Sequence, residues 1–242
     1  MGSKSRIAKH IAPILQDYID KNNIKHYTEP FAGGCNIIDK IKCENRYGYD
    51  INPYLIALLI HVSSGEELPE TINREEYNAV RTDFNNCTNE YPDWYIGCVG
   101  FLASYNGRFF DGGYAQSGYE KTKHGERYRD YYRESKDNLL AQAPMLEGVW
   151  LATMNYKYLG VENQLIYCDP PYQNTKQYGI SKGFDYNEFW DIMRKWSKNN
   201  IVVVSELNAP SDFICIWQQE VSRSIKTTDK SKAVEKLFVL EK

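Results

Sequence analysis

An apolar run that ends in two prolines constrains the fold of this chain more than any other feature. Residues 165–168 read Leu-Ile-Tyr-Cys, and Asp169, Pro170, Pro171 and Tyr172 follow directly. Each proline fixes its own φ and lacks an N–H, and each biases the residue before it toward an extended conformation. The sequence therefore predicts a strand that ends in a stiff, non-helical corner.

This corner can present three chemical groups together: the Asp169 carboxylate, the Pro170 carbonyl and the Tyr172 ring. Two hydrogen-bond acceptors and a flat apolar surface suit a planar ring that bears an exocyclic amine. An ordinary strand-to-loop turn is the alternative, because Asp-Pro pairs commonly initiate turns. A second motif elsewhere in the chain is needed to decide between the two interpretations.

A glycine turn lies upstream, in residues 27–38, which read Tyr-Thr-Glu-Pro-Phe-Ala-Gly-Gly-Cys-Asn-Ile-Ile. We expect a strand up to Thr28, the turn, and an amphipathic helix from about Asn36, an order that lets a ligand approach the backbone closely. A second short apolar stretch ends in Asp50, and an acidic residue at the end of the second strand of a βαβ unit can bind ribose hydroxyls. The loop lacks the three-glycine dinucleotide pattern and a Gly-Lys-Ser/Thr, so it suits a nucleoside without a pyrophosphate. A simple βα turn with a surface aspartate is the alternative.

Strands and helices alternate along the chain. One amphipathic helix pattern covers residues 6–20, and another, with Phe189, Met193 and Trp196 on one side, precedes a run of buried β-branched residues. The alternation predicts a doubly wound α/β sheet. The expected strands are residues 26–29, 46–49, 149–153, 165–168 and 201–204, and residues 214–223 and 236–240 are expected to form a terminal hairpin.

Residues 57–148 break this pattern, because they are rich in Asn, Tyr and Gly and contain no clear run of parallel strands. Asn106-Gly107 and Asp111-Gly112-Gly113 are hairpin-turn signals. We interpret the segment as a mainly helical insertion that recognises the target. Residues 1–56 and 149–242 would then form one discontinuous catalytic domain.

The formal net charge of −3 argues against a protein that binds a polyanion with its whole surface. A nucleic-acid enzyme would need a localised basic face. Such a face is expected where tyrosines that can stack on bases alternate with basic residues that can neutralise phosphates, namely Lys121, Lys123, Arg127, Arg129, Arg133 and Lys136. A solvated helix face, balanced by the acidic residues of the same segment, is the alternative.

The six cysteines are scattered, and neither a Cys-x-x-Cys pair nor a Cys/His ligand spacing occurs, so no metal site is expected. The sequence has no secretory signal pattern and no long apolar run. We therefore expect a cytoplasmic protein without a membrane partner.

Together, the two motifs resemble those of the Dam-type adenine-N6 DNA methyltransferases. The resemblance extends to Lys4, which matches an N-terminal lysine of that family, and to Asp50-Ile51, which matches its ribose-binding motif. Tyr105-Asn106-Gly107 and Gly112-Gly113-Tyr114 resemble its DNA-facing hairpin. Weaker family motifs fall at Phe184, Ser205, Arg223 and Glu235-Lys236-Leu237.

The resemblance implies a Rossmann-like sheet that binds S-adenosylmethionine and methylates an adenine flipped out of duplex DNA, with Asp169, Pro170, Pro171 and Tyr172 as the catalytic motif. The chemistry requires no metal, a restriction endonuclease is a candidate partner whose existence the sequence does not reveal, and a monomer is the default expectation. The residues implied for the cofactor are Lys4, Glu29, Pro30, Phe31, Ala32, Gly33, Gly34, Asn36, Asp50, Ile51 and Asp169. Those expected for DNA are Asn106, Arg108, Tyr114, Lys121, Lys123, Arg127 and Arg129.

Other functions stay open at this point. Cytosine-N4 methyltransferases resemble this pattern but usually carry Ser-Pro-Pro-Trp, and enzymes that methylate RNA or protein glutamine carry Asn-Pro-Pro-Tyr. A DNA-binding module without catalysis is a further alternative, because the family usually has an aromatic residue shortly before its lysine and residues 1–3 contain none. Phe110 stands where well-known members have an arginine, so their recognition sequence is not carried over to this chain.

Overall fold

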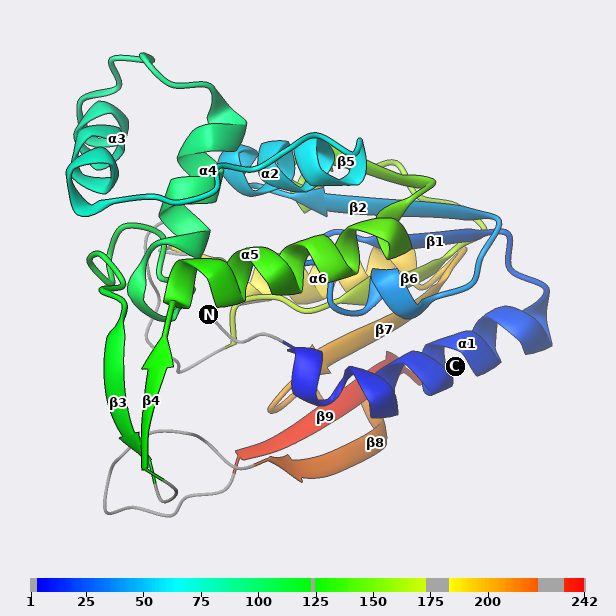
Figure 1. The fold of residues 1–242 in the computed structure, drawn as a ribbon. Coiled ribbons are helices and arrows are strands. Elements are labelled where there is room, and N and C mark those ends of the chain that lie inside the picture. The colour runs from blue at the N-terminus through cyan, green and yellow to red at the C-terminus, as the bar shows by residue number, and fades with distance from the viewer. Residues whose placement is uncertain (1–3, 123–124, 173–182, 222–232, 242) are drawn as a thin grey trace.

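A seven-stranded sheet organises the structure (Figure 1). The structure is a computed structural model that describes residues 4–122, 125–172, 183–221 and 233–241. The strand order is β5-β2-β1-β6-β7-β9-β8. The first five strands are parallel, whereas β9 runs antiparallel to both β7 and β8. The bounds are β1 His26–Glu29, β2 Asn45–Asp50, β5 Val149–Thr153, β6 Leu165–Cys168, β7 Ile201–Glu206, β8 Phe213–Val221 and β9 Ala233–Leu240. The expected α/β sheet and its terminal hairpin are thus confirmed; residues 222 and 223 of the expected hairpin lie outside the described residues.

Helices and a small hairpin complete the fold. The α-helices are α1 Ala8–Asn22, α2 Pro53–Ser63, α3 Arg74–Asn86, α4 Asp93–Leu102, α5 Tyr131–Gln142 and α6 Tyr186–Trp196. Short 3-10 turns are η1 Lys4–Arg6, η2 Ile38–Lys40, η3 Tyr105–Gly107, η4 Ala143–Leu146 and η5 Tyr156–Tyr158. The separate antiparallel hairpin consists of β3 Gly118–Thr122 and β4 Gly125–Arg129.

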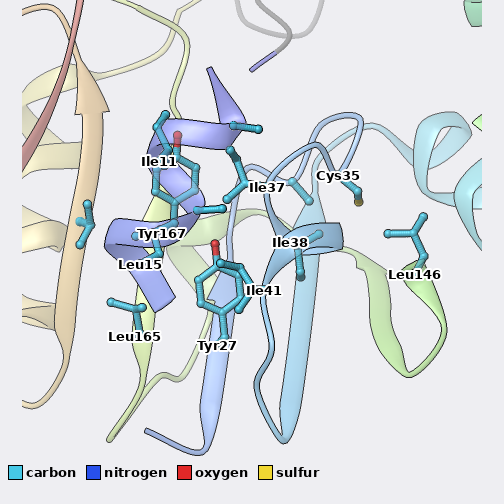
Figure 2. Packing of buried hydrophobic residues seen from close by; sticks show 14 of the residues in the cluster. Ile11, Leu15, Tyr27, Cys35, Ile37, Ile38, Ile41, Leu146, Leu165 and Tyr167 are labelled. Carbon is cyan, nitrogen blue, oxygen red and sulfur yellow. The ribbon is translucent and has the colours of Figure 1, made fainter. Parts of the chain in front are cut away.

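Alternation along the strands divides the core between the two faces of the sheet, because successive side chains of a strand point to opposite faces. On one face, Tyr27, Leu165 and Tyr167 pack against α1 and η2 (Figure 2). Helix α1 supplies Ile11 and Leu15, which lie on one side of the helix because they are four residues apart. The opposite face packs against α6. The buried cluster on this side combines residues of the sheet (Ile166, Val202 and Val204) with residues of the helix (Phe189, Met193 and Trp196).

The prediction of an amphipathic helix from about Asn36 is wrong. Only the single 3-10 turn η2 forms, and Ile41 already has an extended conformation with φ −89° and ψ 133°. Ile37, Ile38 and Ile41 are all buried in the core beneath the sheet. Their spacing imitates a helical face, but β-branched residues are poor helix formers, and tertiary packing decides the conformation of so short a segment.

The segment between β2 and β5 has a buried cluster of its own, which extends from Leu58 to Ala143. The predicted boundary between residues 56 and 57 lies inside α2, and this helix contributes to both cores. Ile56 and Leu59 pack in the core of the sheet, whereas Leu58 and Val62 belong to the second cluster. The division into a catalytic domain and a target-recognition insertion stays a prediction.

We predict that Gly97→Ala destabilises the protein. Gly97 lies in α4, where a Cβ would fall on the backbone carbonyl oxygen of Tyr54 in α2. Replacing glycine within a helix normally stabilises by about 0.5–1 kcal/mol, but here we expect a net loss of about 1–3 kcal/mol from overpacking. Urea unfolding measures the change, with Gly160→Ala as the control, since a Cβ there meets no atom within 4 Å. An unchanged or higher stability of Gly97→Ala would show that α2 and α4 are not packed this closely.

Candidate active site

The strand order reverses between β1 and β6, since the chain proceeds from β1 outward to β2 on one side and from β6 to β7 on the other. In open α/β sheets, ligands bind outside the carboxyl ends of the strands at such a switch point. Glu29 is the last residue of β1, Asp50 is the last of β2, and Asp169 follows β6 directly. The fold therefore brings three carboxyl groups from separate motifs to one edge of the sheet.

The glycine turn is held by contacts from elements that follow it in the chain. Gly33 has φ +50°, and its N–H donates to Asp50 Oδ2 at 3.0 Å. A Cβ at Gly33 would meet no atom within 4 Å, so open space lies beside the backbone. From α5, the Gln142 side-chain amide donates to the carbonyls of Gly34 and Cys35, at 3.0 Å each. Sequence reasoning missed Gln142, because nothing in the sequence pairs it with a turn more than a hundred residues earlier.

Asp50 is fixed by backbone donors on both of its oxygens. Gly33 N–H binds Oδ2, and Asn52 N–H binds Oδ1 at 2.9 Å. Asn52 in turn caps α2 through the amides of Tyr54 and Leu55. Burial raises the pKa of Asp50, and the backbone N–H bonds offset part of that rise. Each carboxylate oxygen has a further lone pair, so Asp50 can still accept from two neighbouring hydroxyls.

Glu29 lies in a different environment, since only 2% of its surface is exposed. The Tyr27 hydroxyl donates to its Oε1 at 2.7 Å. Burial raises the pKa of Glu29 to about 8, although the bond from Tyr27 acts in the opposite direction. Sequence reasoning missed Tyr27, but a signal existed: residues i and i+2 of a strand share one face.

The Asp-Pro-Pro-Tyr corner meets Lys4 of η1. The Lys4 ammonium lies 2.9 Å from Asp169 Oδ1 and 3.2 Å from Glu235 Oε2 of β9, and it donates to the Tyr172 hydroxyl. The same ammonium stands 4.3 Å from the centre of the Tyr172 ring. Tyr172 also donates to Glu235 Oε2 at 2.5 Å and lies 2.9 Å from Ser205 Oγ of β7.

The charges of this cluster compensate one another in part. Burial raises the pKa of Asp169, and the nearby Lys4 ammonium lowers it in part. Burial alone would lower the pKa of Lys4, but Asp169 and Glu235 outweigh that effect and raise it above its ordinary value. Burial and the two carboxylates raise the pKa of Tyr172, so this hydroxyl keeps its proton. The corner therefore combines an ammonium with two carboxylates around one neutral phenol.

Phe31 of the glycine turn belongs to an aromatic cluster. Its ring centre lies 4.9 Å from that of Tyr156, 5.9 Å from that of Phe189 and 6.0 Å from that of Phe184. Phe184, a residue of a weaker family motif, therefore lies beside the glycine turn. Flat apolar rings at this edge of the sheet suit a flat apolar ligand.

The expected DNA-facing hairpin at residues 104–114 is a loop closed by one antiparallel bridge, between Ser104 and Tyr114. Asn106 and Gly107 have φ +56° and +62°, as their turn signal predicts. Phe110 is buried in the second hydrophobic cluster, which explains the absence of a basic residue at this position. The Tyr114 hydroxyl donates to the Ile72 carbonyl at 2.8 Å, so its polar end has an internal partner.

The expected basic face lies on the β3–β4 hairpin and the start of α5, and not on one helix as the alternative assumed. Arg129 pairs with Glu134 and with Glu120, which neutralise its charge. The Arg127 side chain is 69% exposed and lies 3.6 Å from Glu134. Lys121 is exposed, whereas Lys123 lies outside the described residues.

Two exposed tyrosines stand opposite each other on this hairpin. Tyr119 of β3 pairs with Tyr128 of β4, and their ring centres are 5.3 Å apart. The exposed fractions of the two side chains are 75% and 54%. The hairpin thus presents aromatic surface on the face that also carries Lys121, whereas Arg127, which pairs with Glu120, points to the opposite face. Aromatic surface beside a basic side chain is the combination expected of a nucleic-acid contact.

The described part of the chain contains neither a candidate membrane-spanning helix nor a candidate metal site. No helix there is long and apolar enough to cross a bilayer. Nor do three or more His, Cys, Asp or Glu side chains of those residues gather as metal ligands would.

Comparison with known proteins relates the whole chain to one family. The family model described as D12 class N6 adenine-specific DNA methyltransferase matches residues 1–230. The Retron Ec67 DNA adenine methylase of Escherichia coli is 29% identical, over 68% of this chain and 61% of its own length. The Type II methyltransferase M.FokI of Planomicrobium okeanokoites is 24% identical, over 79% of this chain and 31% of its own length. The chain thus spans less than two thirds of either relative.

Similarity to solved structures is weaker. The rRNA methyltransferase aviRa from Streptomyces viridochromogenes aligns with a TM-score of 0.43 at 10% identity, covering 98% of this chain and 84% of that one. Thermoplasma acidophilum 1320 aligns with a TM-score of 0.40 at 9% identity, covering 95% and 87%. The resemblance drawn from the motifs is therefore confirmed by the family match and not by these structures.

Glu29 predicts a pH dependence of stability. Since its folded-state pKa is about 8 and its ordinary value is 4.5, the folded state binds more protons than the unfolded state between these values. Stability must then fall as pH rises through this window, by up to about 1.4 kcal/mol per pH unit. We expect the free energy of unfolding of the wild type, relative to Glu29→Gln, to decrease from pH 5.5 to pH 7.5 (on the order of 1 kcal/mol or more) in urea titrations. A difference that stays constant across this range would contradict the buried, protonated Glu29.

Proposed function

The chain belongs to the D12 class N6 adenine-specific DNA methyltransferase family, and we propose that it transfers a methyl group from S-adenosylmethionine to the N6 amine of an adenine in duplex DNA. The observation that carries the proposal is the Asp-Pro-Pro-Tyr corner at the switch point of the sheet, with Asp169 ion-paired to Lys4. The relatives named above are longer than the aligned part, so activity, substrate and partner are all part of this proposal.

The residues at the carboxyl edge fit S-adenosylmethionine. Asp50 retains lone pairs for two ribose hydroxyls, and the open space at Gly33 leaves room beside the backbone. Phe31 and its aromatic neighbours offer an apolar surface for a purine. When bound, this cofactor would supply a methyl group that is already activated by its attachment to a positive sulfonium.

Asp169 and Pro170 would act on the adenine amine. The lone pair of this amine is delocalised into the ring, and acceptors for both of its hydrogens push the nitrogen toward tetrahedral geometry. The Asp169 carboxylate and the Pro170 carbonyl are placed consecutively in a stiff corner, so they can serve as the two acceptors. Lys4 favours the ionised form of Asp169, which accepts hydrogen bonds without donating one. Positioning and electrostatics supply the rate gain, and the amine loses its proton only after methylation.

A base inside a duplex must leave the stack before its amine can reach such a corner. Tyr172 would then stack on the flipped adenine, at a scale of about 1–3 kcal/mol per base. The duplex would contact the loop at residues 104–114 and the β3–β4 hairpin, through Asn106, Arg108, Tyr114, Lys121, Arg127 and Arg129. Because Arg129 is paired twice within the protein, Arg127 and Lys121 are the stronger candidates for phosphates.

Asp169→Ala should abolish methyl transfer to DNA, with a loss of at least about 100-fold in rate, since it removes an acceptor for the reacting amine. S-adenosylmethionine should still bind, though more weakly. Incorporation of labelled methyl groups into duplex DNA measures the rate, and Asp17→Ala, at an exposed position of α1, is the matched control. Wild-type turnover in Asp169→Ala would exclude the assigned role.

Asp50→Ala should act on cofactor binding and not on the chemical step. Loss of two hydrogen bonds to an ionised group corresponds to a dissociation constant raised by about 100-fold or more. Calorimetric titration with S-adenosylhomocysteine checks this affinity. Asp50→Asn, which keeps one acceptor for the Gly33 N–H, separates ligand contacts from collapse of the loop. An affinity equal to that of the wild type in both variants would remove Asp50 from the site.

A further inference from the structure

The Tyr172 hydroxyl collects partners from three elements that are distant in sequence. Lys4 of η1 donates to it, Ser205 of β7 lies 2.9 Å from it, and Glu235 of β9 accepts from it at 2.5 Å. A side chain whose ring merely stacks on a base would need none of these contacts. Three partners on one phenol oxygen indicate that the position of its proton matters.

The donors and acceptors around the Tyr172 hydroxyl determine where its proton lies. An ionised carboxylate only accepts, so the phenol proton lies toward Glu235. The two lone pairs of the phenol oxygen then accept from Lys4 and from Ser205. Lys4 has three N–H donors, and its three acceptors are Tyr172, Asp169 and Glu235. Glu235 is therefore an acceptor for the phenol proton and for the ammonium at once.

The strand topology explains how Glu235 reaches this place. Leu237 and Lys236 pair with Ser205 and Glu206 at the end of β7. Because β9 runs antiparallel to β7, the next residue toward its amino end, Glu235, comes to lie beyond the carboxyl end of β7. The same topology places it at the edge of the sheet where Asp169 emerges from β6.

Without Glu235, the phenol proton has another acceptor within reach. The Tyr172 hydroxyl also interacts with the Asp169 carboxylate: burial raises the pKa of Asp169, and this interaction offsets a part of the rise. If the proton turned to Asp169, it would occupy an oxygen that the reacting amine needs. The Lys4 ammonium would also lose one of its two carboxylate partners, so it would form an ion pair with Asp169 alone.

We propose that Glu235 is a positioning residue that draws the Tyr172 proton and part of the Lys4 charge away from Asp169, and so keeps Asp169 available as an acceptor for the substrate amine. The inference rests on the proposed function. It assigns to β9 a part in the reaction although Glu235 touches no substrate atom.

A double-mutant cycle tests the proposal. Glu235→Ala should lower the single-turnover rate by about 10- to 100-fold, the equivalent of losing a charge-assisted hydrogen bond or two. Tyr172→Phe keeps the ring but has no proton to redirect, so the loss caused by Glu235→Ala should be much smaller in that background. Glu235→Gln, whose amide oxygen can accept the same proton, should recover most of the rate. Equal losses in both backgrounds, with no recovery by Gln, would overturn the proposal in favour of a merely structural role.

The same double-mutant cycle can be measured by urea unfolding, which does not require enzymatic activity. The shift of the unfolding midpoint caused by Glu235→Ala should be smaller in Tyr172→Phe than in the wild type, because the contact is already broken. The control cycle replaces Tyr172→Phe by Tyr158→Phe, which removes a hydroxyl from a side chain that is 78% exposed, and should be additive. If the wild type transfers no methyl group, the proposed function fails, and this second cycle still decides the contact: additive shifts for Glu235 and Tyr172 would overturn it.

Discussion

The ion pair between Lys4 and Asp169 is the interaction on which the rest of the site depends. It joins the short turn η1 to the residue that directly follows the buried strand β6. Removing two charges from water is costly, and their attraction compensates only when further hydrogen bonds satisfy the remaining donors and acceptors. Glu235 and the Tyr172 hydroxyl supply those bonds for the ammonium. The members of the cluster therefore depend on one another, because substituting one member leaves another buried charge without its partner.

Three carboxyl groups at one edge of the sheet show how environment separates their chemistry. Glu29 lies under the glycine turn, takes a hydrogen bond from Tyr27, and has its pKa raised to about 8 by burial. Asp50 is held by two backbone N–H groups. Asp169 faces an ammonium and belongs to a corner that cannot become helical. Different environments often divide the roles of neighbouring carboxyl groups, and the roles that we propose for Asp50 and Asp169, acceptors for hydroxyls and for an amine, differ from that of the buried acid Glu29.

Local signals in the sequence were sufficient for the strands and the corner. Short apolar runs with clear ends predicted β1, β2, β5, β6 and β7, and the prolines at 170 and 171 predicted how β6 ends. The helix expected from Asn36 failed because three isoleucines imitate a helical face while the core of the sheet determines their conformation. The motifs therefore predicted that Asp50 and Asp169 lie at the carboxyl ends of their strands, but they did not predict the conformation of the segment that follows the glycine turn.

Contacts between distant segments could not be predicted in this way. Gln142 holds the glycine turn from α5, and Glu235 reaches Tyr172 because β9 runs antiparallel to β7. Gln142 carries no local signal, and the weaker family motif at Glu235 did not indicate that this residue contacts Tyr172. The turn signals at residues 104–114 predicted the positive φ of Asn106 but not that a single bridge closes the loop. Pairing of remote segments is set by topology, which one sequence reveals only in outline.

The identity of the methylated nucleoside decides whether the protein acts on adenine in duplex DNA. Duplex DNA free of modified bases is incubated with the protein and methyl-labelled S-adenosylmethionine, digested to nucleosides and separated by chromatography. We predict that the label appears in N6-methyladenine, because we propose that the Asp169 corner accepts the hydrogens of the adenine amine. Label in N4-methylcytosine, or label only when RNA is supplied, would contradict it, as would the absence of label from a protein that still binds the cofactor.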